Sequence, residues 1–179
     1  MAELHLIVGP MFSGKTSRLI NIANLSKIEG KKIFTINYKN DTRYSNKDKI
    51  VTHDGLGMDC FMVGKNIMSI LDKNDYLNSE IVLINESQFF ENLLQFCLHS
   101  LGLNKTIFVS GLNGDSNMES FGEIDKLIPN CDTITHLNSR CSLCGNLAPF
   151  TKRIVDNNDK ELIGSGNYYM PTCRSCYYF

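Results

Sequence analysis

The residues most able to do chemistry are the eight at positions 9–16, Gly-Pro-Met-Phe-Ser-Gly-Lys-Thr, which match the pattern G-x-x-x-x-G-K-[ST]. The glycines of such a loop let the backbone curl around an anion with its N–H groups pointing inward, and the following helix adds positive potential. We expect Lys15 to reach the β- and γ-phosphates and Thr16 to hold Mg²⁺ through its hydroxyl. The pattern predicts a nucleoside triphosphate site, but it leaves the acceptor open because kinases, GTPases and ATPases all use it.

Four of the seven cysteines form two C-x-x-C pairs, namely Cys141 with Cys144 and Cys173 with Cys176. Each pair can present two thiolates to one tetrahedral Zn²⁺; a redox pair or two chance pairs of buried thiols are the alternatives. Four thiolates leave the metal no open position, so we expect a structural zinc that ties together the ends of segment 145–172. The remaining cysteines are expected to be core or surface residues rather than ligands, namely Cys60, Cys97 and Cys131.

Glu86 is the first carboxylate after the continuous apolar run 81–84. Its position suggests a general base that accepts the proton of an attacking hydroxyl, although a solvated loop acid would look the same in the sequence. Asp41 and Arg43 lie in the loop after another apolar run. They could help with Mg²⁺ and with phosphate charge respectively.

The elements that must position these residues follow from apolar patterning. Strand-like runs lie at 4–8, 32–38, 81–84, 106–110 and 133–137. Segments with helical character lie at 17–23, 65–71, 90–101 and 124–128, and polar loops are expected at 39–59 and 111–121. Alternation of this kind predicts an α/β fold of the P-loop NTPase type, with a mostly parallel sheet flanked by helices. The loops that follow the first four strands should share the ligand-binding edge of that sheet.

Composition divides the chain near residue 137, because cysteines, glycines and tyrosines then replace periodic apolar residues. We expect a P-loop nucleotide-binding domain over 1–137 and a small zinc-ribbon-like domain over 138–179. The net charge is −1, and the segment from Arg140 onward contains five basic and three acidic side chains. Nucleic acid is therefore not an expected partner. Neither a membrane-spanning stretch nor a signal pattern is evident, which predicts a cytoplasmic protein with no membrane partner.

With these motifs in hand, the chain resembles the thymidine kinase family found in animal cytosol, many bacteria and poxviruses. The resemblance covers almost the whole length. It rests on the phosphate loop with its Pro-Met-Phe insert, on Asp-Thr-Arg-Tyr-Ser at 41–45 and Thr-His-Asp at 52–54, and on Glu-Ser-Gln-Phe-Phe at 86–90. Phe121-Gly122, Thr-Lys-Arg at 151–153, Ile163-Gly164 and Tyr169 complete the match.

The resemblance implies transfer of the γ-phosphate of ATP to the 5′-hydroxyl of thymidine or deoxyuridine. It implies a catalytic set of Glu86 as base with Lys15 and Arg43. It also implies a lasso-like loop, held by the zinc, that closes over the pyrimidine. The implied ATP- and Mg²⁺-binding residues are Gly9, Pro10, Met11, Phe12, Ser13, Gly14, Lys15, Thr16, Asp41, Asn85 and Gln88. The implied nucleoside-binding residues are Met11, Glu86, Phe89, Leu112, Ser116, Phe121, Thr151, Ile163, Gly164 and Tyr169. A homotetramer and feedback inhibition by thymidine triphosphate (dTTP) are further family properties.

Two positions depart from the family pattern. Asn85 stands where the family has an Asp that contacts Mg²⁺-bound water, which predicts weaker Mg²⁺ binding because a negative charge beside the metal is lost. Ser116 stands where the family has a Phe beside the nucleoside. Losing that contact could weaken stacking by about 1 kcal/mol or make room for a larger substrate.

One alternative remains open at this stage. The chain could be a P-loop module whose zinc ribbon docks nucleic acid or protein, with catalysis reduced. The modest charge of the ribbon speaks against that function. A GTPase is disfavoured because no Asn-Lys-x-Asp sequence is evident.

Overall fold

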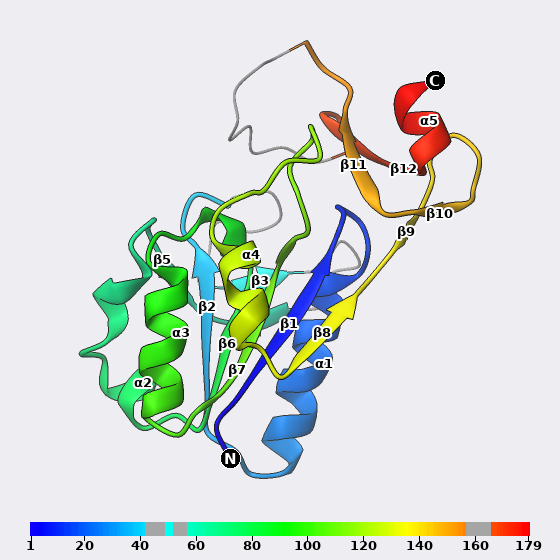
Figure 1. Cartoon of the computed structure of the whole chain (residues 1–179). Coiled ribbons are helices and arrows are strands. Elements are labelled where there is room, and N and C mark those ends of the chain that lie inside the picture. Colours follow the sequence, from blue (N-terminus) through cyan, green and yellow to red (C-terminus); the bar gives the residue numbers. More distant parts are fainter. Residues whose placement is uncertain (42–48, 52–56, 157–165) are drawn as a thin grey trace.

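A parallel six-stranded sheet forms the centre of the computed structural model, which describes residues 1–41, 49–51, 57–156 and 166–179 (Figure 1). The strand order is β5-β2-β6-β7-β1-β8, and every neighbouring pair runs parallel. The strands span β1 (Glu3–Gly9), β2 (Ile33–Tyr38), β5 (Phe61–Val63), β6 (Ile81–Ile84), β7 (Thr106–Leu112) and β8 (Thr133–His136). Because all six point the same way, the loops that leave their carboxyl ends lie along one edge, as the sequence predicts.

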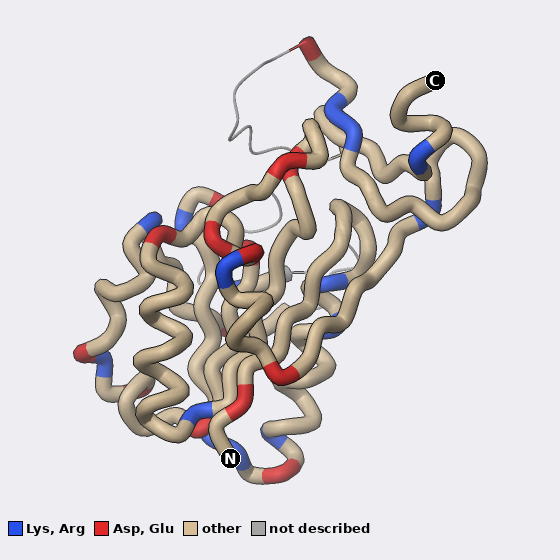
Figure 2. The backbone as a smooth tube through the Cα atoms, viewed as in Figure 1, with Lys and Arg blue, Asp and Glu red and all other residues tan. Residues whose placement is uncertain are grey.

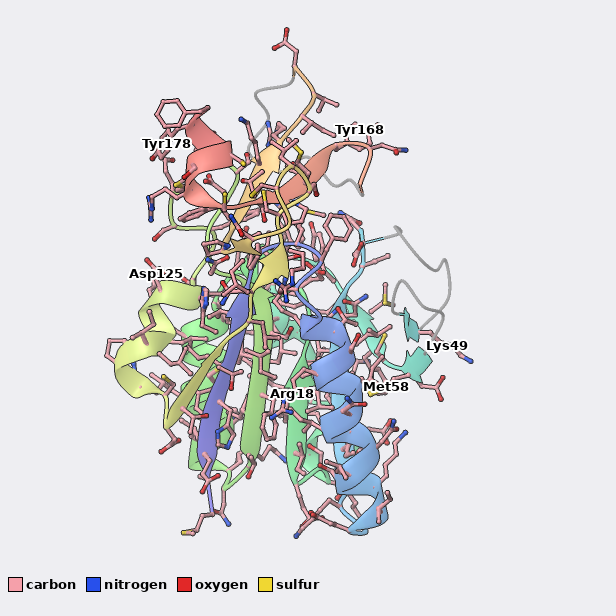
Figure 3. All side chains as sticks on the ribbon, turned by 90° about the vertical axis from the view of Figure 1, so that its right-hand side faces the viewer. Arg18, Lys49, Met58, Asp125, Tyr168 and Tyr178 are labelled. Carbon is pink, nitrogen blue, oxygen red and sulfur yellow. The ribbon has the colours of Figure 1, made fainter. Side chains whose placement is uncertain are left out.

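The central strands β2 and β6 are buried on both faces, which explains their continuous apolar runs. Helix α1 (Lys15–Ile28) covers one face, where Leu19, Ile20 and Ala23 pack against the sheet (Figure 3). The opposite face packs against η1 (Ile67–Ile70), α2 (Asn74–Leu77), α3 (Leu93–Gly102) and α4 (Ile124–Leu127). Two further short 3₁₀ segments are η2 (Ser87–Phe89) and η3 (Ile128–Asn130).

Three expectations about local structure are wrong. The segment 39–59, expected to be a loop, contains a hairpin of β3 (Lys49–Val51) and β4 (Gly57–Asp59), and its apolar residues Ile50 and Met58 pack in the α1 cluster. The helix expected over 65–71 is only the four-residue η1, and α3 begins at Leu93 rather than at 90. The strand β5 and the helix α2 were not expected, because both are too short to show a period.

The C-terminal segment forms a small antiparallel unit above the carboxyl edge of the sheet (Figure 1). Its elements are β9 (Ser139–Arg140), β10 (Leu147–Ala148), β11 (Phe150–Arg153), β12 (Tyr169–Thr172) and α5 (Arg174–Tyr178). The division at 137/138 stays a prediction.

Acidic and basic residues are interspersed along the described backbone (Figure 2). Among the described residues, no helix is long and apolar enough to span a membrane.

Candidate active site

The phosphate loop joins the end of β1 to the start of α1. Gly14 adopts φ 83° and ψ 15°, a left-handed conformation that glycine reaches without a steric penalty, and it directly precedes the helix. Its carbonyl accepts the first intrahelical bond, from the Arg18 N–H at 2.9 Å. The N–H groups of the first turn of α1 therefore have no intrahelical acceptor and can bind an anion.

The Lys15 side chain lies inside this loop. Its Nζ donates to the Pro10 carbonyl at 2.6 Å, and the residue is only 8% exposed. The Ser13 hydroxyl donates to the same carbonyl at 2.8 Å. Thr16 is half-buried in the first turn of α1. The amine and the hydroxyl that the sequence assigns to phosphate and Mg²⁺ thus both lie at the same loop.

Glu86 follows β6 in a strained backbone conformation. Its φ of 51° and ψ of 42° fall in the left-handed region, which a residue with a Cβ rarely adopts and which costs on the order of 1–3 kcal/mol. The half-buried carboxylate accepts a hydrogen bond from Gln88 Nε2 at 2.6 Å. Gln88 Oε1 in turn accepts from the Leu112 N–H at 3.1 Å. The Gln88 amide therefore ties the carboxylate to the end of β7.

Two glycines make room for this arrangement. A Cβ on Gly111 would lie 2.9 Å from Gln88 Oε1 and would overlap the Ser87 hydroxyl. A Cβ on Gly122, whose φ is 68°, would overlap the Gln88 carbonyl. The end of β7 and the loop after it can thus close onto η2 only because both positions lack side chains.

Asn85 is buried beside Glu86, with its Nδ2 donating to Asn37 Oδ1 at 3.0 Å. Asn37 lies on the neighbouring strand β2 and is also buried. An aspartate at position 85 could keep this contact, because the Asn37 amide can rotate to present its N–H₂ group. The structure thus offers a neutral amide pair where the sequence leads us to expect a contact to Mg²⁺-bound water.

Several of the predicted nucleoside-binding residues fall into two groups. Phe89 stacks on Tyr38 with ring centroids 4.8 Å apart, and Phe121 meets Phe89 edge-on at 5.4 Å. In the second group, the Met11 N–H donates to Thr151 Oγ1 at 2.9 Å. Both groups come from the carboxyl edge of the sheet or from the unit above it.

The remaining predicted residues lie as follows. Leu112 is the last residue of β7 and Ser116 lies in the loop after it, and both are half-buried. Tyr169 is buried on β12, where its hydroxyl accepts from Arg153 Nη2 at 3.2 Å. Asp41 is half-buried, and its backbone N–H donates to the Tyr38 carbonyl at 3.0 Å. Three predicted residues lie outside the described ranges, namely Arg43, Ile163 and Gly164.

The four paired cysteines converge on one point, with all Sγ atoms within 4.8 Å of one another. Cys144 Sγ and Cys173 Sγ are 3.6 Å apart, close to the separation of about 3.8 Å that tetrahedral Zn–S bonds of about 2.3 Å require. Backbone N–H groups, first that of Cys173, lower the pKa of Cys141 to about 6, whereas hydrogen bonding to the Cys144 and Cys173 thiols raises the pKa of Cys176 to about 12. A divalent cation would allow all four to be thiolates together.

The unit that carries the cysteines is hydrogen-bonded directly to the phosphate loop. The Ser139 hydroxyl donates to the Phe12 carbonyl at 3.1 Å, and Thr151 accepts from Met11 as described above. The other three cysteines lie apart from this cluster: Cys60 and Cys97 are buried and Cys131 is half-buried. Sequence reasoning missed Ser139, Asn37 and Gly111, because no local pattern indicates contacts so distant along the chain.

A phosphate loop between the first strand and first helix of a parallel sheet defines a P-loop nucleotide-binding α/β protein, here with a four-cysteine unit. The family model described as "Thymidine kinase" matches residues 2–177. The chain therefore belongs to the thymidine kinase family.

Curated relatives agree with this assignment. The chain is 38% identical over 178 residues to thymidine kinase a of Arabidopsis thaliana, covering 97% of this chain and 74% of the plant protein. It is 35% identical over 179 residues to thymidine kinase of rabbit fibroma virus, covering 99% and 97% of the two chains. It is 37% identical over 180 residues to thymidine kinase 1 of Dictyostelium discoideum, covering 98% and 77%.

Proposed function

We propose that the protein is an ATP-dependent nucleoside kinase that transfers the γ-phosphate of ATP to the 5′-hydroxyl of thymidine, and also of deoxyuridine. The observation that carries this proposal is the position of Glu86, a carboxylate held by Gln88 at the sheet edge that also bears the phosphate loop. Only β7 separates β6 from β1, so these two strands run side by side about 10 Å apart at usual strand spacing, with Ile84 level with Leu6. A phosphoryl group and an attacking hydroxyl fit that distance.

The roles of the residues follow from their chemistry. The Lys15 ammonium and the N–H groups at the start of α1 bind and orient the phosphates and neutralise charge that develops during transfer. Glu86 accepts the proton from the attacking hydroxyl. Arg43 is assigned to phosphate charge from the sequence pattern alone. Thr16 would hold Mg²⁺ through its hydroxyl, with Asp41 and Asn85 as further polar groups; Mg²⁺ supplies charge stabilisation when bound.

The nucleoside would lie beneath the C-terminal unit. Phe89, Phe121 and Leu112 offer apolar surface for the base, and Met11 and Thr151 approach from the phosphate loop and β11. Tyr169 lies on β12, at the end of the segment predicted to cover the base. Zinc in this proposal is structural, held by the four cysteines and keeping that segment in place.

The decisive experiment offers the protein ATP, Mg²⁺ and a panel of nucleosides, and measures nucleoside monophosphate and ADP separately. We expect monophosphate from thymidine and deoxyuridine, and its loss in Glu86→Gln. Glu91→Gln, which changes an exposed acid nearby, is the matched control and should retain activity. ADP formed without any phosphorylated nucleoside would instead favour a P-loop module with a docking function. The homotetramer and dTTP inhibition stay predictions from the family resemblance, and the cytoplasmic location stays a prediction from the sequence pattern.

A further inference from the structure

The loop after β7 contains a turn with its own internal hydrogen bonds, formed by residues 115–119. Asp115 Oδ1 accepts from the N–H groups of Asn117 and Glu119, at 2.8 and 2.9 Å. The Asp115 N–H donates to the Glu119 carbonyl at 2.9 Å. Asp115 is only 8% exposed, so its carboxylate organises the turn from inside. The 115–119 turn is therefore expected to move as one body.

This turn is attached to the four-cysteine unit by one strong hydrogen bond. The Tyr177 hydroxyl donates to the Ser116 carbonyl at 2.5 Å, linking residues 61 positions apart. Both residues are half-buried. Figure 1 shows the loop after β7 rising to the level of β11 and β12. The bond is made to a main-chain atom, so it does not depend on which side chain occupies position 116.

The Tyr177 ring is itself held on several sides. Lys152 Nζ donates to the Tyr177 carbonyl at 2.7 Å and lies 5.7 Å from the ring centroid. Phe150 packs against the ring edge-on at 6.1 Å. Cys176, one of the four clustered cysteines, directly precedes Tyr177 in α5. The position of the hydroxyl is thus set by β11 and by helix α5, which carries Cys176 of the four-cysteine cluster.

We propose that Tyr177 is a positioning residue for nucleoside binding, fixing the 115–119 turn by bonding the Ser116 carbonyl from the metal-anchored helix. This inference rests on the proposed function, in which Ser116 borders the nucleoside. In this chain the turn lacks an aromatic side chain at 116 that could pack it in place. The hydrogen bond from the Tyr177 hydroxyl to the Ser116 carbonyl holds the turn instead. Through this bond, the four-cysteine cluster also orders the nucleoside site at the 115–119 turn.

The test is Tyr177→Phe, which keeps the ring and removes only the hydroxyl. We expect KM for thymidine to rise about five- to tenfold, the effect of losing one net hydrogen bond, with kcat and KM for ATP within about twofold of wild type. Zinc content and the thermal unfolding midpoint should stay close to wild type, because the ring contacts remain.

Tyr178→Phe is the matched control, since it removes a hydroxyl from the neighbouring residue. Figure 3 shows Tyr178 on the outer side of α5; it is 62% exposed, and its hydroxyl makes only a 3.8 Å contact to Met118 Sδ. This variant should leave every constant unchanged. An unchanged KM for thymidine in Tyr177→Phe, a loss confined to kcat, or loss of zinc would each overturn the inference. Absence of thymidine phosphorylation by the wild-type protein would instead refute the proposed function.

Discussion

Replacing Gln88 by methionine tests how the carboxylate of Glu86, the proposed general base, is held. The substitution keeps length and volume but removes both polar atoms of a side chain that is 3% exposed. The Glu86 carboxylate loses a donor at 2.6 Å, and the Leu112 N–H loses an acceptor at 3.1 Å. We expect the Glu86 carboxylate to leave the position from which it would accept the proton of the attacking hydroxyl, while Lys15 and the four cysteines are unaffected.

The size of the effect follows from the kind of bond. A hydrogen bond to a charged group contributes about 1.5–3 kcal/mol, and each 1.36 kcal/mol corresponds to tenfold in rate, so kcat should fall by about 10- to 150-fold. Gln88→Glu should lose at least as much, because it places a second carboxylate where the Gln88 amide now meets Glu86 Oε2.

Steady-state kinetics with thymidine and ATP measure this prediction. Gln95→Met, which makes the same substitution at an exposed position of α3, should behave like wild type. A Gln88→Met protein that binds zinc, unfolds near the wild-type temperature and retains wild-type kcat would refute the reasoning that Gln88 holds the base.

Three further predictions concern metal and stability. Purified reduced protein should contain about one zinc per chain. Removing the zinc with a chelator should make the C-terminal unit sensitive to protease before the sheet unfolds. Zinc-free protein with an ordered C-terminal unit would contradict this prediction. Asn85→Asp should tighten apparent Mg²⁺ binding in activity titrations, since it would add a negative charge at the position predicted to face Mg²⁺-bound water, while the Asn37 amide could still hydrogen-bond the new carboxylate. An unchanged Mg²⁺ midpoint would count against that account. Lys105→Met should lower the free energy of unfolding by about 1–3 kcal/mol in denaturant titrations. The reason is that the buried Lys105 Nζ donates to the carbonyls of Tyr76, Leu77 and Ser79 at and just after the end of α2. Lys27→Met, which replaces an exposed lysine, should have little effect.

Much of the fold was predictable because its signals are local. A short stretch of sequence is enough to recognise the run of four buried residues in β6 and the order of strand, loop and helix at 3–28. Where tertiary packing decided, the expectations were wrong. The β3–β4 hairpin has too few residues for a readable period, and it is stabilised because Ile50 and Met58 are buried in the hydrophobic cluster beneath α1.

The sequence by itself determined which groups are available: a phosphate loop with Lys15 and Thr16, an acid at the end of a buried strand, and four thiols in two matched pairs. Only the tertiary structure decided how these groups connect. Met11 and Thr151 lie 140 positions apart, and Tyr177 and Ser116 lie 61 apart, yet each pair is hydrogen-bonded. Residue spacing encodes helices, strands and turns, whereas such contacts depend on the order of strands in the sheet and on where the four-cysteine unit docks. No short stretch of sequence carries that information.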